Sequence, residues 1–189
     1  MADYARMEWK AVSDAEGTGL IIRAAQFSAW KHRHQRRKSQ AAEPYINHPL
    51  DLAHVLWFEG KVHDPTVIAA ALLHDTIEDT QTTFGELQGE FGNTVASLVM
   101  EVTDEPSVHW RLRKRLQISR AKGATWGAKQ IKLADKICNL RDMVASTPKG
   151  WSIDRVRNYF DWSKEVIDQI RGTNPLLERK FDNIYLRRP

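Results

Sequence analysis

Four ionisable residues have types that could bind a metal, and three of them directly follow apolar stretches of the sequence. His74 and Asp75 follow the run AALL, Asp135 follows IKLA, and His48 stands in the segment YINHP. Burying such groups without a partner is costly, so we expect each of them to have one. Two imidazoles and two carboxylates form a mixed nitrogen and oxygen set that suits a divalent transition metal. We expect one Mn²⁺ ion per chain, with Fe²⁺ or Zn²⁺ as the alternatives.

Two further carboxylates, Glu78 and Asp79, lie about one helical turn beyond Asp75 in the segment HDTIEDT. At that spacing they could accept or orient a proton beside the expected metal. Asn139 follows Asp135 at i+4 and therefore lies on the same face of a helix. Taken alone, each of these residues is also typical of a helix cap or of a solvated helix end.

The segments around these residues have helical spacing. Apolar side chains recur at intervals of three and four residues at Leu20, Ile21, Ala24, Ala25, Phe27 and Trp30. Asp64-Pro65 predicts the start of a helix that is apolar on nearly all sides up to about His74, and that helix should be central. Thr83 and Glu86 fit a capping box.

Asn93 is expected to cap a separate helix that follows the capping-box helix. Further helices are predicted at about 108–121, 127–144, 153–171 and 175–187. His48 precedes Pro49, which favours an extended or turn conformation. No alternating run is long enough to predict a strand, so we expect an all-α fold with an N-terminal extension at 1–17 and one domain at 18–189.

Composition narrows the class of protein. The 189 residues are 42% hydrophobic and carry a formal net charge of +4, which is typical of an ordinary globular domain. Cys138 is the only cysteine, which favours a reducing compartment and excludes a cysteine-based zinc site. The opening segment has no apolar block and no apolar run approaches the ~20 residues that span a bilayer. We therefore expect a cytoplasmic protein without a membrane partner.

The modest excess of positive charge fits a pocket for an anionic small molecule better than a nucleic-acid surface. The sequence carries no signal for a particular oligomeric state.

The motifs occur in a recognisable order between about Ala24 and Arg187: KHRHQRRK, PYINHP, AALLHDTIEDT, EVTD, KLADKICNLRD, RVRNYFDW and RGTN. In these motifs the chain resembles the HD-domain hydrolases that remove the 3′-pyrophosphate from the alarmones ppGpp and pppGpp. The chain length and the long loop between Lys38 and Pro44 resemble the small, stand-alone metazoan type rather than the long bifunctional enzymes. The resemblance implies a helical domain with a central metal site and a guanine-nucleotide alarmone as substrate.

The resemblance also implies roles for individual residues. The family's metal ligands fall on His48, His74, Asp75 and Asp135. Its catalytic acidic pair falls on Glu78 and Asp79. Its substrate contacts fall on Arg37, Lys38, Asn139, Arg155 and Tyr159. Glu78 is then the expected proton acceptor, and the planar guanidinium of Arg37 can stack on guanine.

The chain departs from the family pattern at two positions. His34 replaces a residue that is usually Gly or Gln, and Trp110 stands where a relative has a phosphate-binding lysine. Arg111, Lys114 or Arg115 could supply that phosphate contact instead.

Two other functions fit the same residues. Relatives of this type can act on a nucleotide with a 2′-phosphate, such as NADPH. A catalytically silent domain could instead bind a nucleotide or RNA through the basic stretches QRRK and RLRKR.

Overall fold

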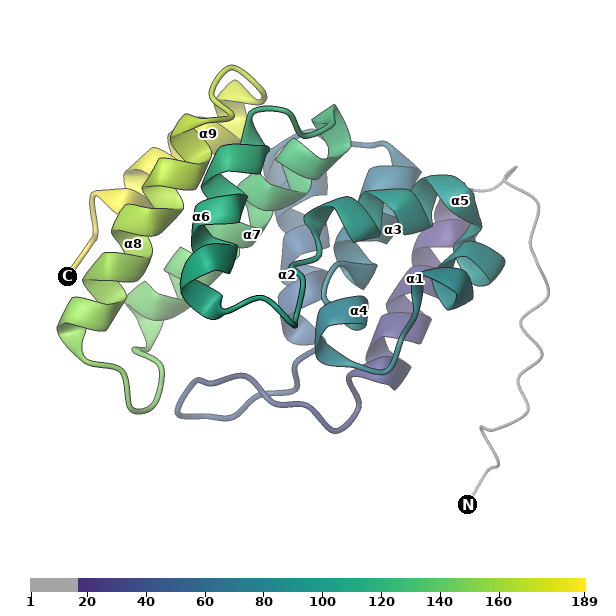
Figure 1. Ribbon diagram of the computed structural model, residues 1–189, viewed down its shortest axis with the longest axis horizontal. Helices are drawn as coiled ribbons and strands as arrows, with labels where there is room; N and C mark the ends of the chain where they lie inside the picture. The colour runs from purple at the N-terminus through teal and green to yellow at the C-terminus, as the bar shows by residue number, and fades with distance from the viewer. Residues whose placement is uncertain (1–16) are drawn as a thin grey trace.

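The computed structural model describes residues 17–189, and most of them are helical (Figure 1). The elements are α1 (Gly17–Lys31), α2 (Asn47–His54), the π-helix η2 (Val55–Glu59), α3 (Pro65–Leu73), α4 (Thr76–Asp79), α5 (Phe84–Val102), α6 (Trp110–Ala121), α7 (Trp126–Ala145), α8 (Ile153–Asp168) and α9 (Pro175–Tyr185). Residues 17–189 contain no strand, only an isolated bridge between Arg36 and Pro44 in the loop from α1 to α2. The all-α prediction is confirmed.

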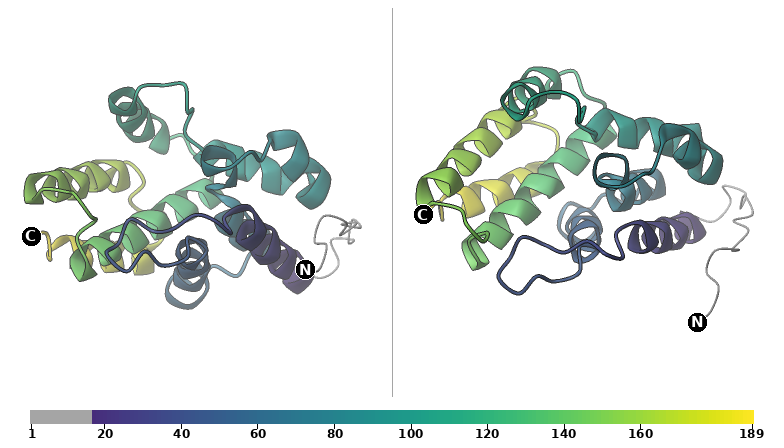
Figure 2. Two further views of the ribbon diagram at one scale, coloured as in Figure 1. Left: turned by 90° about the horizontal axis from the view of Figure 1, so that it is seen from below. Right: turned by 60° about the horizontal axis from the view of Figure 1, so that its bottom comes forward.

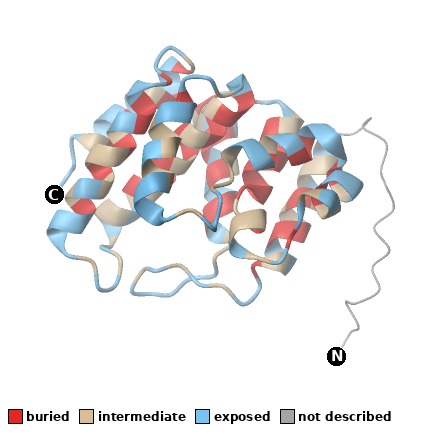
Figure 3. Ribbon diagram, viewed as in Figure 1, coloured by how far each residue is buried: buried red, intermediate tan, exposed pale blue. Residues whose placement is uncertain are grey.

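Helix α3 is the centre of the first half of the fold. Asp64 caps it by accepting a hydrogen bond from the backbone N–H of Thr66 at 2.8 Å, and Pro65 occupies its first turn, as predicted. Every residue from Val67 to Leu73 is buried (Figure 3). Helices α1, α2, α5 and α7 all pack against α3. Because α3 is buried, the polar residues that follow it are also covered: His74 is buried and Asp75 is half-buried.

Helix α7 is the second central element, and it passes through the middle of the molecule (Figure 2). The hydroxyl of Thr125 caps its N-terminus, and its buried face includes Ile131, Leu133, Ile137 and Leu140. It packs against α2, α3, α5, α8 and α9. The site residues of α7 are consequently held between both halves of the fold.

The helices predicted in the second half of the chain are present, with ends that differ by up to three residues. Thr83 accepts a hydrogen bond from the N–H of Glu86 at 3.2 Å, as a capping residue should. The Glu86 carboxylate does not return the bond, because it accepts hydrogen bonds from Lys31 at 2.7 and 2.8 Å.

The predicted start of a second helix near Asn93 is confirmed, because the non-helical Gly92, whose φ of +80° suits glycine, divides α5 into two helical segments. The capping role predicted for Asn93 is wrong. The Asn93 side chain accepts a hydrogen bond from Gln88 at 3.0 Å instead of capping a new helix. The positive φ at Gly92 separates the two helical segments that the sequence indicated.

The extended or turn conformation expected at His48 is wrong, because His48 lies in the first turn of α2. The N–H groups of a first turn have no partner within the helix, so Pro49 removes no helical hydrogen bond there. Placing His48 on a helix buries its side chain and turns it toward α3 and α7.

None of the helices in the described part of the chain is both long enough and apolar enough to cross a membrane. The predicted N-terminal extension lies outside the described residues except for Gly17, at which α1 begins.

Candidate active site

A cavity of about 590 Å³ opens between the loop from α1 to α2, the end of α3, α4, α7 and α8. The loop from α1 to α2 reaches toward the turn between α7 and α8 (Figure 2). The two segments are linked there, because the backbone N–H of Lys149 donates to the carbonyl of Lys38 at 3.0 Å. One end of the cavity is therefore bordered by segments that are far apart in the sequence.

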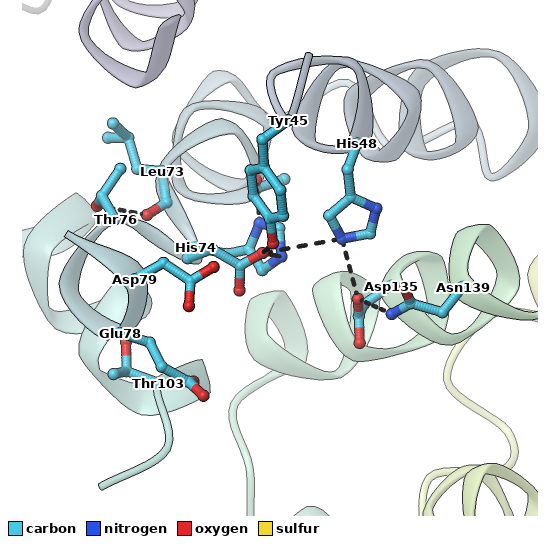
Figure 4. A network of polar contacts seen from close by, with 12 residues as sticks. Tyr45, His48, Leu73, His74, Thr76, Glu78, Asp79, Thr103, Asp135 and Asn139 are labelled. Carbon is cyan, nitrogen blue, oxygen red and sulfur yellow. Dashed lines mark hydrogen bonds and ion pairs between the residues drawn. The ribbon is translucent and has the colours of Figure 1, made fainter. Parts of the chain in front are cut away.

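The four predicted metal ligands all line this cavity. The side chains of His48, His74 and Asp135 point toward one another (Figure 4). Nε2 of His48 lies 3.3 Å from Oδ1 of Asp135 and 3.8 Å from Oδ2 of Asp75. Nε2 of His74 lies 2.9 Å from the same oxygen of Asp75. Ligand atoms of His48, His74 and Asp135 lie within 4.8 Å of one another, which is close enough to hold a metal ion.

The imidazole of His74 is prepared to act as a ligand. Its Nδ1 donates to the carbonyl of Ala71 at 2.8 Å, which directs Nε2 toward the carboxylates. Nε2 is buried and has no hydrogen bond of good geometry among the described residues. A metal would satisfy this nitrogen, and a backbone hydrogen bond to the other ring nitrogen is the usual support of a ligating histidine. The residues present therefore fit a divalent metal.

The charges in this cluster balance one another. Burial lowers the pKa of His74, but the carboxylates of Asp75 and Asp135 outweigh burial and raise the pKa to about 9. Burial raises the pKa of Asp75, yet the imidazoles of His74 and His48 hold it well below its ordinary value. In this state a proton on His74 pairs with the carboxylates, and a metal that binds here must displace that proton.

Neighbouring side chains orient both carboxylate ligands. The hydroxyl of Tyr45 donates to Oδ2 of Asp75. On α7, Asn139 donates to Oδ1 of Asp135 at 2.6 Å, and Nζ of Lys136 donates to Oδ2 at 2.9 Å. Asn139 and Asp135, which the i+4 spacing predicts on one helix face, are thus joined by a hydrogen bond.

Glu78 lies on α4, one turn beyond the ligands, and lines the cavity. Its carboxylate accepts hydrogen bonds from the backbone N–H of Asp104 at 3.2 Å and from Arg113 at 3.1 Å. Burial raises its pKa to about 7, and the charges of Asp104 and Asp75 contribute to the shift. A carboxylate with a pKa near neutrality is well suited to exchange protons with a reacting water.

Asp79 also lines the cavity, and its Oδ2 accepts a hydrogen bond from Nε2 of Gln35 at 2.7 Å. Oε1 of Gln35 faces Nδ1 of the buried His32 at 2.6 Å. If Nδ1 carries the proton, His32 fixes the amide of Gln35 in the orientation that donates to Asp79. His32 thus supports the site without belonging to the ligand cluster.

Most of the predicted substrate contacts lie in the same cavity. Arg37, Lys38, Asn139 and Tyr159 line it. The guanidinium of Arg37 donates to the carboxylate of Asp142 and lies 5.7 Å from the ring centroid of Tyr45. The Tyr159 ring packs against Trp162, with 5.1 Å between the centroids.

Arg155 does not line the cavity. It is exposed near the start of α8, and its guanidinium lies over the ring of Trp151 at 4.1 Å. Trp151 does line the cavity, so Arg155 is one residue removed from it.

Trp110 is 53% exposed at the start of α6, away from the cavity lining. Of the three cations that could supply the missing phosphate contact, Arg111 and Arg115 are exposed. Lys114 instead places Nζ 4.6 Å from the ring centroid of Trp162. Lys114 is thus the one of the three that lies against a residue of the cavity wall.

Sequence reasoning assigned no role to several residues that the fold brings into the cavity. These residues are Gln35, Tyr45, Lys132, Lys136 and Trp162. Lys132 and Lys136 lie within one turn of Asp135 on a helix with many buried residues, and lysines that close to a predicted metal-binding carboxylate are the signal that could have identified them. The contacts of Gln35 and Tyr45 depend on the path of a loop, which no local pattern indicates.

Comparisons with known proteins agree with this geometry. Residues 24–157 match the HD domain family. The guanosine-3′,5′-bis(diphosphate) 3′-pyrophosphohydrolase MESH1 of Xenopus tropicalis is 50% identical over 167 residues, which cover 88% of this chain and 93% of that protein. Its human counterpart is 47% identical over 89% of this chain and 94% of its own length.

A solved structure described as a metazoan ortholog of SpoT that hydrolyzes ppGpp matches with a TM-score of 0.87 and 46% sequence identity. The match covers 89% of this chain and 95% of that one.

Proposed function

We propose, because this chain belongs to the HD domain family, that it is a guanosine-3′,5′-bis(diphosphate) 3′-pyrophosphohydrolase. The observation that carries the proposal is the joint position of His48, His74, Asp75 and Asp135 beside Glu78 in one cavity. The likeness to relatives named for this activity, over most of both chains, supports it. The chain then acts on a small anionic nucleotide, ppGpp or pppGpp.

The proposed cofactor is Mn²⁺, held by the two imidazoles and two carboxylates. When bound, such an ion polarises a phosphoryl oxygen and lowers the pKa of a bound water. Tyr45, Asn139 and Lys136 keep the carboxylates in position for it, through the contacts described above.

The proposed reaction adds water to the phosphorus that is bonded to the 3′ oxygen of the ribose. Glu78 accepts the proton of the attacking water, and Asp79, held by Gln35, orients that water or shares its proton. The bond between this phosphorus and the ribose oxygen breaks, the ribose oxygen takes up a proton, and pyrophosphate leaves in one piece. GDP is the other product when ppGpp is the substrate.

Product analysis tests this reaction. Purified protein supplied with Mn²⁺ and ppGpp should release pyrophosphate and GDP with a one-to-one stoichiometry, as measured by anion-exchange chromatography. Two metals that clamp a terminal phosphate would be typical of stepwise removal of phosphate. Within residues 17–189 the clustered ligands form one group. Orthophosphate as the first product would contradict the proposed reaction.

Nucleotide contacts should affect binding more than chemistry. We expect Arg37→Ala and Tyr159→Phe to raise KM for ppGpp, roughly tenfold for Arg37, while kcat changes less. Both residues line the cavity but lie outside the ligand cluster and α4. Initial rates over a range of ppGpp concentrations give both constants.

Two exposed or remote residues serve as matched controls for these variants. Arg33 is exposed in the loop from α1 to α2, which also contains Arg37. The hydroxyl of Tyr185 donates to Asp161 at 3.0 Å, away from the cavity. Arg33→Ala and Tyr185→Phe should leave KM unchanged. If KM is also unchanged in Arg37→Ala and Tyr159→Phe, the two residues do not hold the nucleotide.

We also infer that residues 18–189 act as one domain, with 1–17 as an extension of it. Cys138 is the single cysteine, so the chain can form no internal disulfide, which supports a cytoplasmic location for the enzyme.

A further inference from the structure

Three lysines gather on the side of the cavity formed by α6, α7 and α8. Lys132 and Lys136 lie one turn apart on α7, and both line the cavity. Lys114 on α6 lies at its edge, against Tyr159 and Trp162. We call Lys114, Lys132 and Lys136 the lysine cluster.

Trp162 holds two members of the cluster near each other. Nζ of Lys136 lies 4.3 Å from its ring centroid and Nζ of Lys114 lies 4.6 Å from it. The indole Nε1 also donates to the backbone carbonyl of Lys114 at 3.1 Å, which fixes the ring against α6. An aromatic face attracts a cation but carries no net charge, so it cannot neutralise two ammonium groups.

Neighbouring carboxylates offset only part of the positive charge of the cluster, because Asp104, Asp135 and Glu101 raise the pKa of Lys132 by less than burial and Lys136 lower it. Among residues 17–189, Lys136 is the only member with an ion pair, to Asp135. Burial lowers the pKa of Lys132, and the charge of Lys136 lowers it further. Burial and Lys136 also lower the pKa of Lys114. The protein therefore keeps cations together at an electrostatic cost.

The acidic residues near Lys132 are engaged elsewhere. The carboxylate of Asp104 accepts a hydrogen bond from Gln117 at 2.7 Å. Glu101 accepts from the N–H and hydroxyl of Thr125 at 2.7 and 2.6 Å. Asp135 accepts from Asn139 and Lys136 within the metal-ligand cluster. Lys132 is thus left facing the cavity, where an anion would relieve the repulsion.

We propose that the lysine cluster is a second phosphate-binding site, with Lys132 as its central contact and Lys114 and Lys136 on either side. The site rests on the proposed function, since it is meant for a phosphate of the nucleotide other than the one attacked by water. Ammonium groups bind phosphate oxygens through charge-assisted hydrogen bonds. The phosphate comes either from the 5′-diphosphate or from the terminal phosphate of the 3′-pyrophosphate.

The central test replaces Lys132 by Met, which keeps most of the apolar stem and removes the charge. For ppGpp we expect KM to rise roughly 10- to 100-fold, the range for losing one charge-assisted hydrogen bond, with a smaller change in kcat. Lys132→Arg should restore much of the binding. The matched control is Lys129→Met, because Lys129 is half-buried one turn earlier on α7 and does not line the cavity.

A second substrate identifies which phosphate is bound. Guanosine 3′-diphosphate lacks the 5′ phosphates, so its KM should not change in Lys132→Met if the cluster binds the 5′-diphosphate. If the cluster binds the terminal phosphate of the 3′-pyrophosphate, KM rises for both substrates. An unchanged KM for both, or an equal rise in Lys129→Met, would overturn the proposed site.

Binding without turnover separates this proposal from the proposed function. Calorimetry with inorganic pyrophosphate and with GDP should show weaker binding of at least one of them to Lys132→Met than to Lys129→Met. That comparison holds even if the parent protein fails to hydrolyse ppGpp, an outcome that would contradict only the proposed function. Equal affinities of the two variants for both compounds would contradict the lysine cluster alone.

Discussion

Glu78→Gln is expected to keep the metal and to lower kcat by about 10²- to 10⁴-fold, the usual contribution of a general base. The amide has the shape of the carboxylate but cannot accept a proton from water. The Glu78 carboxylate is held by the backbone N–H of Asp104 and by Arg113 rather than by the ligand residues, so the metal content should not change. Elemental analysis and initial rates on the same preparation measure both quantities.

The pH dependence gives this variant a signature that structural damage would not reproduce. Burial raises the pKa of Glu78 to about 7, so the protonated, inactive form dominates at lower pH. The kcat of the parent should therefore rise with pH between about 6 and 8, as the carboxylate ionises. Glu78→Gln has no group that ionises at this position, so its residual kcat should not rise between about pH 6 and 8.

Glu105→Gln is the matched control, because Glu105 is an exposed carboxylate in the loop that follows α5. It should retain both the kcat of the parent and the rise of kcat with pH. A Glu78→Gln variant that turns over at the parent rate would remove Glu78 from the reaction and leave Asp79 as the remaining carboxylate of α4.

The sequence predicted His74, Asp75 and Asp135 because they directly follow apolar runs, whereas the prediction for His48 depended on the motif YINHP. A helix such as α3 has to be buried, so the polar pair that ends it must lie in the interior. The same reasoning placed Asp135 and Asn139 on one face of α7, where they form a hydrogen bond. Apolar runs and helical periodicity are local features of the sequence, which is why they can be recognised without the structure.

Contacts that depend on the path of the chain could not be predicted in the same way. Tyr45 reaches Asp75 and Gln35 reaches Asp79 from a loop whose course is set by the bridge between Arg36 and Pro44. The motif resemblance implies a nucleotide contact for Arg155, which stays a prediction, since its guanidinium lies over Trp151 in the cavity lining. Helix α2 is not predicted because Pro49 favours an extended or turn conformation at His48, although proline also suits the first turn of a helix.

Removing a metal ligand should lower both the metal content and the rate of hydrolysis strongly. His74→Ala and Asp75→Ala are each expected to weaken Mn²⁺ binding by more than about 100-fold, since changes in supporting residues alone can cost that much. Each variant deletes a ligand atom and also removes the contact of 2.9 Å between Nε2 of His74 and Oδ2 of Asp75. Hydrolysis of ppGpp should fall with the metal content, which elemental analysis measures after reconstitution with Mn²⁺ and gel filtration.

His54→Ala is the control, because His54 is an exposed histidine on the same helix as His48 and its ring packs against Phe58. It should retain one Mn²⁺ per chain, and circular dichroism should show that all the variants remain helical.

Binding of Mn²⁺ to the parent should also strengthen as the pH rises, because the metal must displace the proton that the carboxylates hold on His74. A parent protein that takes up no Mn²⁺, or ligand variants that keep it in full, would show that the four residues form only a network of ion pairs.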